Sequence, residues 1–219
     1  MGASVLRFTR KEHAVQHTVF DTPVIKTLLR WFSKAYLKVF GWKVEGRVPD
    51  VPRCVMIAAP HTSNWDFPIT MFLSFALHGK VYWMGKDKLF RKPFGSVMRW
   101  LGGIPVDRSK ANNVVAQMVE VFNSHEDLIV IIPPEGTRGK VSYWKTGFYH
   151  IANGAGVPII LGYVDYGRKA GGIGPTVWPT GDIEADMRTI CSFYTGVTAK
   201  YPEKSSLAAV DPARSRKAA

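Results

Sequence analysis

The chain has 219 residues, of which 46% are hydrophobic and 21% are charged. These values suit one globular domain and exclude a chain too short or too polar to form its own core. The formal net charge of +12 predicts attraction to an anionic partner, which is nucleic acid, an acidic lipid surface, or an acidic substrate or carrier.

Residues 1–17 include basic side chains but no apolar stretch before a small-residue cleavage site, so we expect no signal peptide. Leu6 occupies the position at which a myristoylation signal has Ser or Thr. The longest apolar segment, 67–77, falls short of the roughly 18 apolar residues that a transmembrane helix requires. If the protein acts at a membrane, we therefore expect it to lie on the surface.

Residues 23–40 carry a basic residue at every fourth position, which predicts a basic stripe along one helix: Lys26, Arg30, Lys34 and Lys38. Pro23 suits the first turn, and Gly41 ends the helix. No acidic residue interrupts the segment, and Trp31 lies among several large apolar residues. Such a helix is typical of segments that lie on anionic bilayers. The alternative is a helix packed on its own domain with a solvated lysine edge.

Beyond residue 42, short apolar runs alternate with segments of helical periodicity. The runs predict buried strands at 54–59, 81–84, 128–132 and 157–164. The periodic segments predict helices at 67–77, 112–123 and 185–201, the last capped by Asp182. This alternation implies an α/β single-domain sandwich with a mixed, largely parallel central sheet flanked by helices. We divide the chain into an N-terminal segment at 1–42, a domain at 43–202 and a polar tail at 203–219.

The first candidate site follows the strand predicted at 54–59 and contains His61 and Asp66. The two side chains can meet if His61 lies in the turn and Asp66 in the first turn of a helix capped by one of three residues, Thr62, Ser63 or Asn64. Asp66 would then set the tautomer of the imidazole, and His61 could take a proton from a hydroxyl. The carboxyl end of a central strand is where open α/β sheets place their sites. The alternative is a histidine that is hydrogen-bonded in an ordinary turn.

Two further segments offer groups that suit a phosphate. After the strand predicted at 128–132, Gly136 lets the backbone approach a ligand, Thr137 offers a hydroxyl and Arg138 a forked donor. Arg108 ends a short strand behind two glycines. A surface turn and an ordinary loop arginine are the alternatives. The sequence has no nucleophile elbow, phosphate-binding loop, dinucleotide fingerprint or metal-ligand cluster.

In order along the chain, these segments resemble the glycerolipid acyltransferase family, which includes the bacterial lysophosphatidate acyltransferases. Four blocks carry the resemblance over roughly residues 55–164: His61-Thr-Ser-Asn-Trp-Asp66, Gly103-Ile-Pro-Val-Asp-Arg108, Glu135-Gly-Thr-Arg138 and Val157-Pro-Ile-Ile160. The stretch Lys86-Asp-Lys-Leu-Phe also resembles the link between the first two blocks. Four blocks in order are far more specific than any one of them.

The resemblance implies an enzyme, peripheral on the cytoplasmic face of a membrane, that moves a fatty acyl group from acyl-CoA or acyl-carrier protein to a lysophospholipid hydroxyl. His61 would be the general base, and Asp66 would steady the imidazolium. The acceptor and its phosphate would be bound by a second set of residues, Arg108, Glu135, Gly136, Thr137 and Arg138. Acyl-CoA or acyl-carrier protein is a co-substrate, and we expect no further cofactor and no metal.

Two departures from the family pattern leave the acceptor open. Pro60 stands where many members have Asn, and Pro133 where many have an aromatic residue. A lyso-aminolipid or another hydroxylated lipid is therefore an alternative acceptor, and an acyl thioesterase is an alternative reaction. A basic nucleic-acid-binding protein is the non-enzyme alternative. Large apolar residues interleave with the basic ones in 23–40, which suits a lipid surface better than a nucleic-acid groove, and we expect no nucleic acid as partner.

Overall fold

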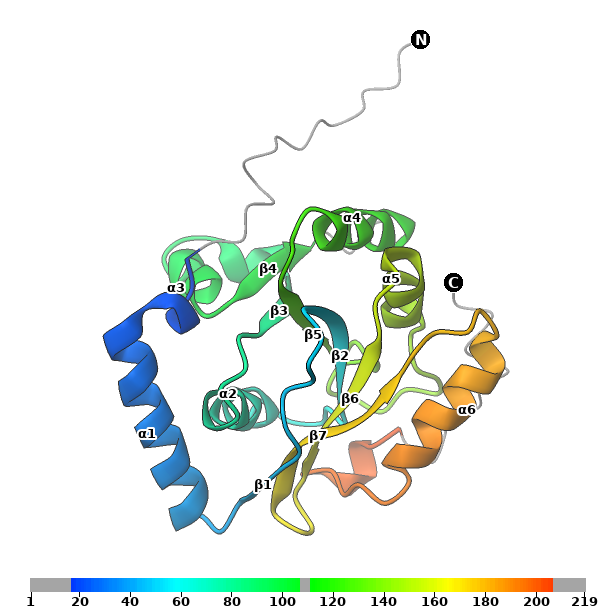
Figure 1. The fold of residues 1–219 in the computed structure, drawn as a ribbon. Coiled ribbons are helices and arrows are strands. Elements are labelled where there is room, and N and C mark those ends of the chain that lie inside the picture. The colour runs from blue at the N-terminus through cyan, green and yellow to red at the C-terminus, as the bar shows by residue number, and fades with distance from the viewer. Residues whose placement is uncertain (1–16, 107–110, 207–219) are drawn as a thin grey trace.

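The computed structural model describes residues 17–106 and 111–206. Its described part is built around a seven-stranded sheet of order β1-β7-β6-β2-β5-β3-β4 (Figure 1). The strands are β1 (Lys43–Glu45), β2 (Arg53–Ala59), β3 (Tyr82–Lys86), β4 (Gly103–Val106), β5 (Leu128–Ile132), β6 (Ile159–Asp165) and β7 (Ala170–Val177). Every neighbouring pair is parallel except β6 and β7, which are antiparallel. The mixed, largely parallel sheet predicted from the sequence is confirmed.

Helices cover both faces of this sheet (Figure 1). The helices are α1 (Pro23–Val39), α2 (Asp66–Ala76), α3 (Gly95–Trp100), α4 (Ala111–Asn123), α5 (Gly147–Ala155) and α6 (Ile183–Tyr194), with short 3-10 turns η1 (Val19–Asp21), η2 (Asp87–Phe90) and η3 (Pro202–Lys204). One core cluster joins the sheet to α4, α5 and α6, and another joins the opposite face to α2. Among the described helices, none is long and apolar enough to cross a membrane.

The central strands are apolar on both faces because both faces are covered. In β6 every residue from Ile159 to Asp165 is buried, and β5 is buried from Leu128 to Ile131. Continuous apolar runs are what doubly covered parallel strands require. The strands predicted at 54–59, 81–84, 128–132 and 157–164 are all present, with boundaries that differ by at most two residues.

Helix α1 packs on α2 and forms an outer layer on that side of the sheet. Its Leu37 is buried in a cluster with Ile69 and Leu73 of α2, and its Tyr36 ring packs on Phe72 with centroids 4.7 Å apart. The helix begins at Pro23, as the sequence predicts. The division of the chain at residues 42 and 202 stays a prediction.

One predicted helix end differs from the structure, and β1, α5 and β7 were not predicted. The helix predicted at 185–201 ends at Tyr194, because the chain turns at Thr195 and Gly196 and then runs along the end of β6. Strand β7 has no apolar run and was not predicted. Its sequence is rich in glycine, and Gly172 adopts a φ of 150°, where an added Cβ would lie 1.9 Å from the carbonyl oxygen of Glu45. This close approach of backbones favours glycine over the apolar residues that signal a strand.

Candidate active site

The carboxyl ends of four parallel strands, β2, β3, β5 and β6, meet at one edge of the sheet. His61 follows β2 and Lys86 ends β3, while the segment from Glu135 follows β5 and Tyr166 follows β6. The sheet therefore brings together side chains that lie up to 105 positions apart in the sequence. A site at this edge is what open α/β sheets favour.

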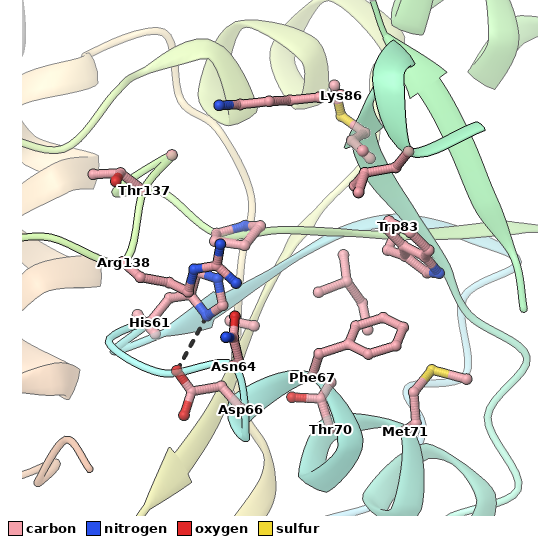
Figure 2. Close-up of a pocket in the computed structure, with 18 of the residues that line it drawn as sticks. His61, Asn64, Asp66, Phe67, Thr70, Met71, Trp83, Lys86, Thr137 and Arg138 are labelled. Carbon is pink, nitrogen blue, oxygen red and sulfur yellow. Dashed lines mark hydrogen bonds and ion pairs between the residues drawn. The ribbon is translucent and has the colours of Figure 1, made fainter. Parts of the chain in front are cut away.

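His61 and Asp66 form the predicted pair. Nδ1 of His61 lies 3.1 Å from Oδ2 of Asp66, and the side chains are 22% and 6% exposed (Figure 2). A carboxylate at this distance favours the tautomer in which Nδ1 carries the proton and donates it to the hydrogen bond. The lone pair then lies on Nε2, in a ring that lines the adjacent cavity. This arrangement can accept a proton from a bound hydroxyl.

Asp66 is the first residue of α2 and is buried. Its Oδ2 accepts hydrogen bonds from the backbone N–H groups of Thr62 and Ser63, each at 2.8 Å. The start of a helix favours a carboxylate because the first N–H groups of a helix point toward it. Asp66 therefore lies in the first turn, as predicted.

The predicted cap is wrong. The residue preceding α2 is Trp65, which makes no side-chain cap hydrogen bond. The chain from His61 to Asp66 instead curls around the Asp66 carboxylate, which accepts hydrogen bonds from the N–H groups of Thr62 and Ser63. The hydroxyl of Ser63 accepts from the N–H of Trp65 at 3.1 Å within the same turn.

Glu135 holds the backbone of His61 through a hydrogen bond. Its Oε1 accepts a hydrogen bond of 3.0 Å from the backbone N–H of His61, and the side chain is 3% exposed. Burial raises the pKa of the Glu135 carboxyl to about 7. Its other oxygen, Oε2, has no hydrogen-bond partner among the described residues. Glu135 is not among the residues that line the cavity, so its visible contact is with the turn that carries His61.

A cavity of about 510 Å³ opens beside His61 (Figure 2). Next to the imidazole its lining is polar and includes Asn64, Thr137 and Arg138. Away from it, between α2 and the sheet, the lining is apolar and consists mainly of Phe67, Met71, Trp83, Met98 and Ile131. The volume lies within the roughly 300–1,000 Å³ of ligand pockets, and the division into a polar and an apolar end suits an amphipathic ligand.

Three cations line the cavity: Lys86, Lys88 and Arg138. All three residues are exposed. Among the described lining residues the one acid is Asp66, whose charge faces His61. The polar end therefore favours an anionic group near His61.

The structure brings the site residues predicted after β5 to the cavity, apart from Glu135. Gly136, with a φ of 64°, Thr137 and Arg138 all line it. Arg108 lies outside the described residues. The sequence reasoning missed Lys86 and Lys88 as site residues, although a basic residue at the end of a strand, as Lys86 is, was a signal that could have identified one of them.

A second missed residue is Tyr166, immediately after β6. Its hydroxyl donates a hydrogen bond of 2.9 Å to Oδ1 of Asp66. Its position after a predicted strand was visible in the sequence, but nothing local indicated that it reaches Asp66. Within the described residues, no group of three His, Cys, Asp or Glu side chains could hold a metal ion.

A His–Asp pair at the carboxyl edge of a largely parallel α/β sheet, beside a cavity with cationic and apolar ends, defines a candidate active site. The model of the Acyltransferase family matches residues 42–161, which is more than half of the chain and includes His61, Asp66 and the segment from Glu135 to Arg138. The chain belongs to this family.

Two relatives are named 1-acyl-sn-glycerol-3-phosphate acyltransferase. The protein from Haemophilus influenzae is 34% identical over 142 residues, which cover 60% of this chain and 57% of the relative. The protein from Escherichia coli is 33% identical over 132 residues, which cover 56% of this chain and 52% of the relative. The chain thus spans a little over half the length of these relatives.

A solved structure has a similar fold. The 1-acyl-sn-glycerophosphate (LPA) acyltransferase from Thermotoga maritima is 20% identical and superposes with a TM-score of 0.51, over 75% of this chain and 74% of that chain. At this identity the likeness concerns the fold.

Proposed function

We propose that the protein transfers a fatty acyl group from an acyl thioester, acyl-CoA or acyl-carrier protein, to the hydroxyl of a lysophospholipid resembling 1-acylglycerol-3-phosphate. The observation that carries the proposal is the His61–Asp66 pair at the junction between the cationic and apolar ends of one cavity. Both relatives bear the name of this activity, which supports the choice of acceptor.

In the proposed reaction Nε2 of His61 removes the proton of the acceptor hydroxyl as its oxygen attacks the thioester carbonyl carbon. The new C–O bond forms and the C–S bond breaks. The proton on the imidazolium then passes to the departing thiolate, so that the products are an ester and a free thiol. Asp66 stabilises the imidazolium through Nδ1. A general base of this kind contributes about 10²–10⁴-fold in rate.

The cationic end of the cavity is the proposed site of the acceptor's phosphate. Arg138 offers a forked donor that pairs with phosphate oxygens, and Lys86 at the end of β3 and Lys88 in η2 add positive charge. Thr137 and Gly136 line the same end. Arg108 is a further proposed phosphate ligand, because it ends the Gly103-Ile-Pro-Val-Asp-Arg108 block that resembles the family.

The apolar end is the proposed site of a fatty acyl chain. Phe67 and Met71 from α2 and Trp83 from β3 line this part of the cavity, and the Phe67 and Trp83 rings meet edge-on with centroids 5.0 Å apart (Figure 2). Each methylene removed from water there gains roughly 0.8 kcal/mol. The junction between the two ends lies beside His61, where the thioester carbonyl would have to be.

Helix α1 is the proposed contact with an anionic membrane surface. Its outward face is apolar: Val24, Leu28, Trp31 and Val39 are 63–79% exposed. Large apolar side chains turned to water on one helix face mark a surface that docks elsewhere. Lys34 and Lys38 are exposed on the same helix and complement anionic headgroups, whereas Lys26 and Arg30 are half-buried.

A second exposed apolar segment lies at the mouth of the cavity. Leu89 of η2 lines the cavity, and Phe94 and Val97, beside and within α3, are exposed as well. The indole N–H of Trp100 at the end of α3 donates to the hydroxyl of Thr22, just before α1, at 3.4 Å. The two apolar segments are therefore neighbours, which supports entry of a lipid acceptor from a bilayer. The enzyme would be peripheral, on the cytoplasmic face.

The test is thiol release from a long-chain acyl-CoA, and from acyl-carrier protein, in mixed micelles with lysophosphatidate, a lyso-aminolipid or no acceptor. We expect release that depends on lysophosphatidate and is lost in His61→Ala. His125→Ala is the matched control, because His125 precedes β5 at the opposite edge of the sheet. Release without an acceptor would identify a thioesterase, and release that depends on the lyso-aminolipid would replace the acceptor.

A further inference from the structure

The two oxygens of the Asp66 carboxylate have different partners. Oδ2 faces His61 Nδ1 and accepts the two backbone hydrogen bonds from Thr62 and Ser63. Within residues 17–106 and 111–206, the donor to Oδ1 is the hydroxyl of Tyr166, at 2.9 Å. The carboxylate is thus held at both oxygens, and one of the holding groups comes from a residue 100 positions away.

Tyr166 is itself fixed on several sides. Its backbone N–H donates to the carbonyl oxygen of Thr198 at 2.9 Å, and its ring meets Trp42 edge-on with centroids 5.2 Å apart. The ammonium of Lys200 lies 5.6 Å from the centre of the ring. A side chain anchored by its backbone, its ring and its hydroxyl has little freedom to move away from Asp66.

Burial, and then the negative charge of Asp66, raise the pKa of the Tyr166 phenol. The hydroxyl therefore stays protonated across the working range of an enzyme and serves as a donor to the carboxylate. A hydrogen bond from a neutral donor to a buried charge is among the stronger ones in proteins.

The segment after α6 completes this support. The N–H of Tyr201 donates to the hydroxyl of Thr62 at 3.2 Å, and Lys200 also lies 5.0 Å from the centre of the Trp65 ring. Residues 198–201 therefore contact both Tyr166 and the turn between His61 and Asp66. Tyr166 and this segment lie beyond residue 161, where the match to the family model ends.

We propose that Tyr166 is a positioning residue whose hydroxyl holds Oδ1 of Asp66 so that Oδ2 stays directed at His61 during proton transfer. The inference rests on the proposed use of His61 as a general base. Without the hydroxyl, the carboxylate can rotate about its Cβ–Cγ bond, and one buried oxygen loses its partner. When the acceptor is deprotonated, His61 becomes an imidazolium, and a poorly oriented Asp66 carboxylate stabilises that positive charge less.

The variant that tests this role is Tyr166→Phe, which keeps the ring and removes the hydroxyl. We expect kcat to fall about 10- to 100-fold, the range for a hydrogen bond to a charged group, while KM for both substrates stays the same. The thermal unfolding temperature is expected to shift by no more than about 4 °C, the effect of roughly 1 kcal/mol in a chain of this length. Tyr163→Phe is the matched control, because Tyr163 lies in β6, three residues before Tyr166, and its hydroxyl bonds to Glu45 instead.

A double-mutant cycle separates action through Asp66 from a general structural role. In an Asp66→Asn background, Tyr166→Phe should cause little further loss of kcat. An equal loss in both backgrounds, or an unchanged kcat in the single variant, would overturn the inference.

Failure of the proposed function has a different signature. The wild-type protein would then release thiol without an acceptor, or His61→Ala would retain full activity. In the first case the double-mutant cycle is measured with the hydrolysis rate instead, because the His61–Asp66 pair would activate water. In the second case His61 is not the base, and the inference falls together with the assignment of the site.

Discussion

The carboxylate of Glu135 accepts a hydrogen bond from the backbone N–H of His61 at 3.0 Å, across 74 positions of sequence. Glu135 follows β5 and His61 follows β2, and these strands are neighbours in the sheet. The bond joins two motifs that sequence reasoning treats as separate, one for proton transfer and one for the acceptor. The two motifs are one structural unit, in which the second supports the first.

The raised pKa of Glu135 predicts how this unit responds to pH. The folded-state pKa of about 7 exceeds the usual value of 4.5, so the folded protein binds the proton more tightly than the unfolded chain. The group's contribution to the free energy of unfolding therefore falls as the pH rises from about 4.5 to about 7, by an amount on the order of a few kcal/mol. Glu135→Gln cannot ionise and should lose this dependence.

The measurement is urea unfolding of wild type and Glu135→Gln at several pH values from 4.5 to 8. The stability of the variant relative to wild type should increase with pH across this window and level off above it. Glu203→Gln, at an exposed position, serves as the control and should track wild type. A constant difference between Glu135→Gln and wild type would contradict the prediction.

Arg138→Ala should weaken binding of the proposed phosphate-bearing acceptor specifically. Loss of a charge-assisted bond to phosphate costs about 1.5–3 kcal/mol, so KM for lysophosphatidate should rise about 10- to 100-fold. A monoacylglycerol, which lacks the phosphate, should show no comparable change. Arg188→Ala is the control, because that side chain pairs with Glu184 on the surface of α6. If the two acceptors were affected alike, Arg138 would not be the phosphate ligand.

If the apolar end of the cavity holds the acyl chain as proposed, Thr70→Phe should shorten the acyl chain that is accepted. Thr70 lines the apolar end of the main cavity and also a smaller cavity of about 30 Å³, with which the main cavity shares Ala58 and Val164. A phenyl ring there would fill the space beyond the main cavity. We expect kcat/KM for a palmitoyl donor to fall about 10- to 100-fold relative to a decanoyl donor. Thr189→Phe, on the exposed side of α6, should leave the ratio unchanged.

Trp31→Glu should weaken binding to membranes. Trp31 is 73% exposed on the outward face of α1, and burial of a large apolar side chain is worth about 1.5–3 kcal/mol. Sedimentation with vesicles of phosphatidylglycerol and phosphatidylcholine should show affinity reduced by about tenfold or more. Trp178→Glu is the matched control, because Trp178 is also exposed but lies outside α1. Equal binding by the two variants would show that α1 does not dock.

Much of the fold was predictable because its strands and helices depend on residue patterns within short segments of the sequence. The buried strands β2, β5 and β6 are continuous apolar runs, and α1 has a four-residue repeat with Pro23 at its start. Strand β7 escaped prediction because its glycines serve close backbone contacts rather than side-chain burial. The end of α6 was placed too late because the periodicity continues past Tyr194, whereas hydrogen bonds to the end of β6 redirect the chain.

The sequence by itself determined that the segment containing His61 and Asp66 follows a buried strand, and that Arg138 follows another such strand. These positions depend on neighbours within a few residues. Only the tertiary structure decided that Glu135 supports His61, that Lys86 and Lys88 share the cavity, and that Tyr166 reaches Asp66. The physical reason is that strand order is set by pairing between distant segments, and no local periodicity specifies which strand ends become neighbours.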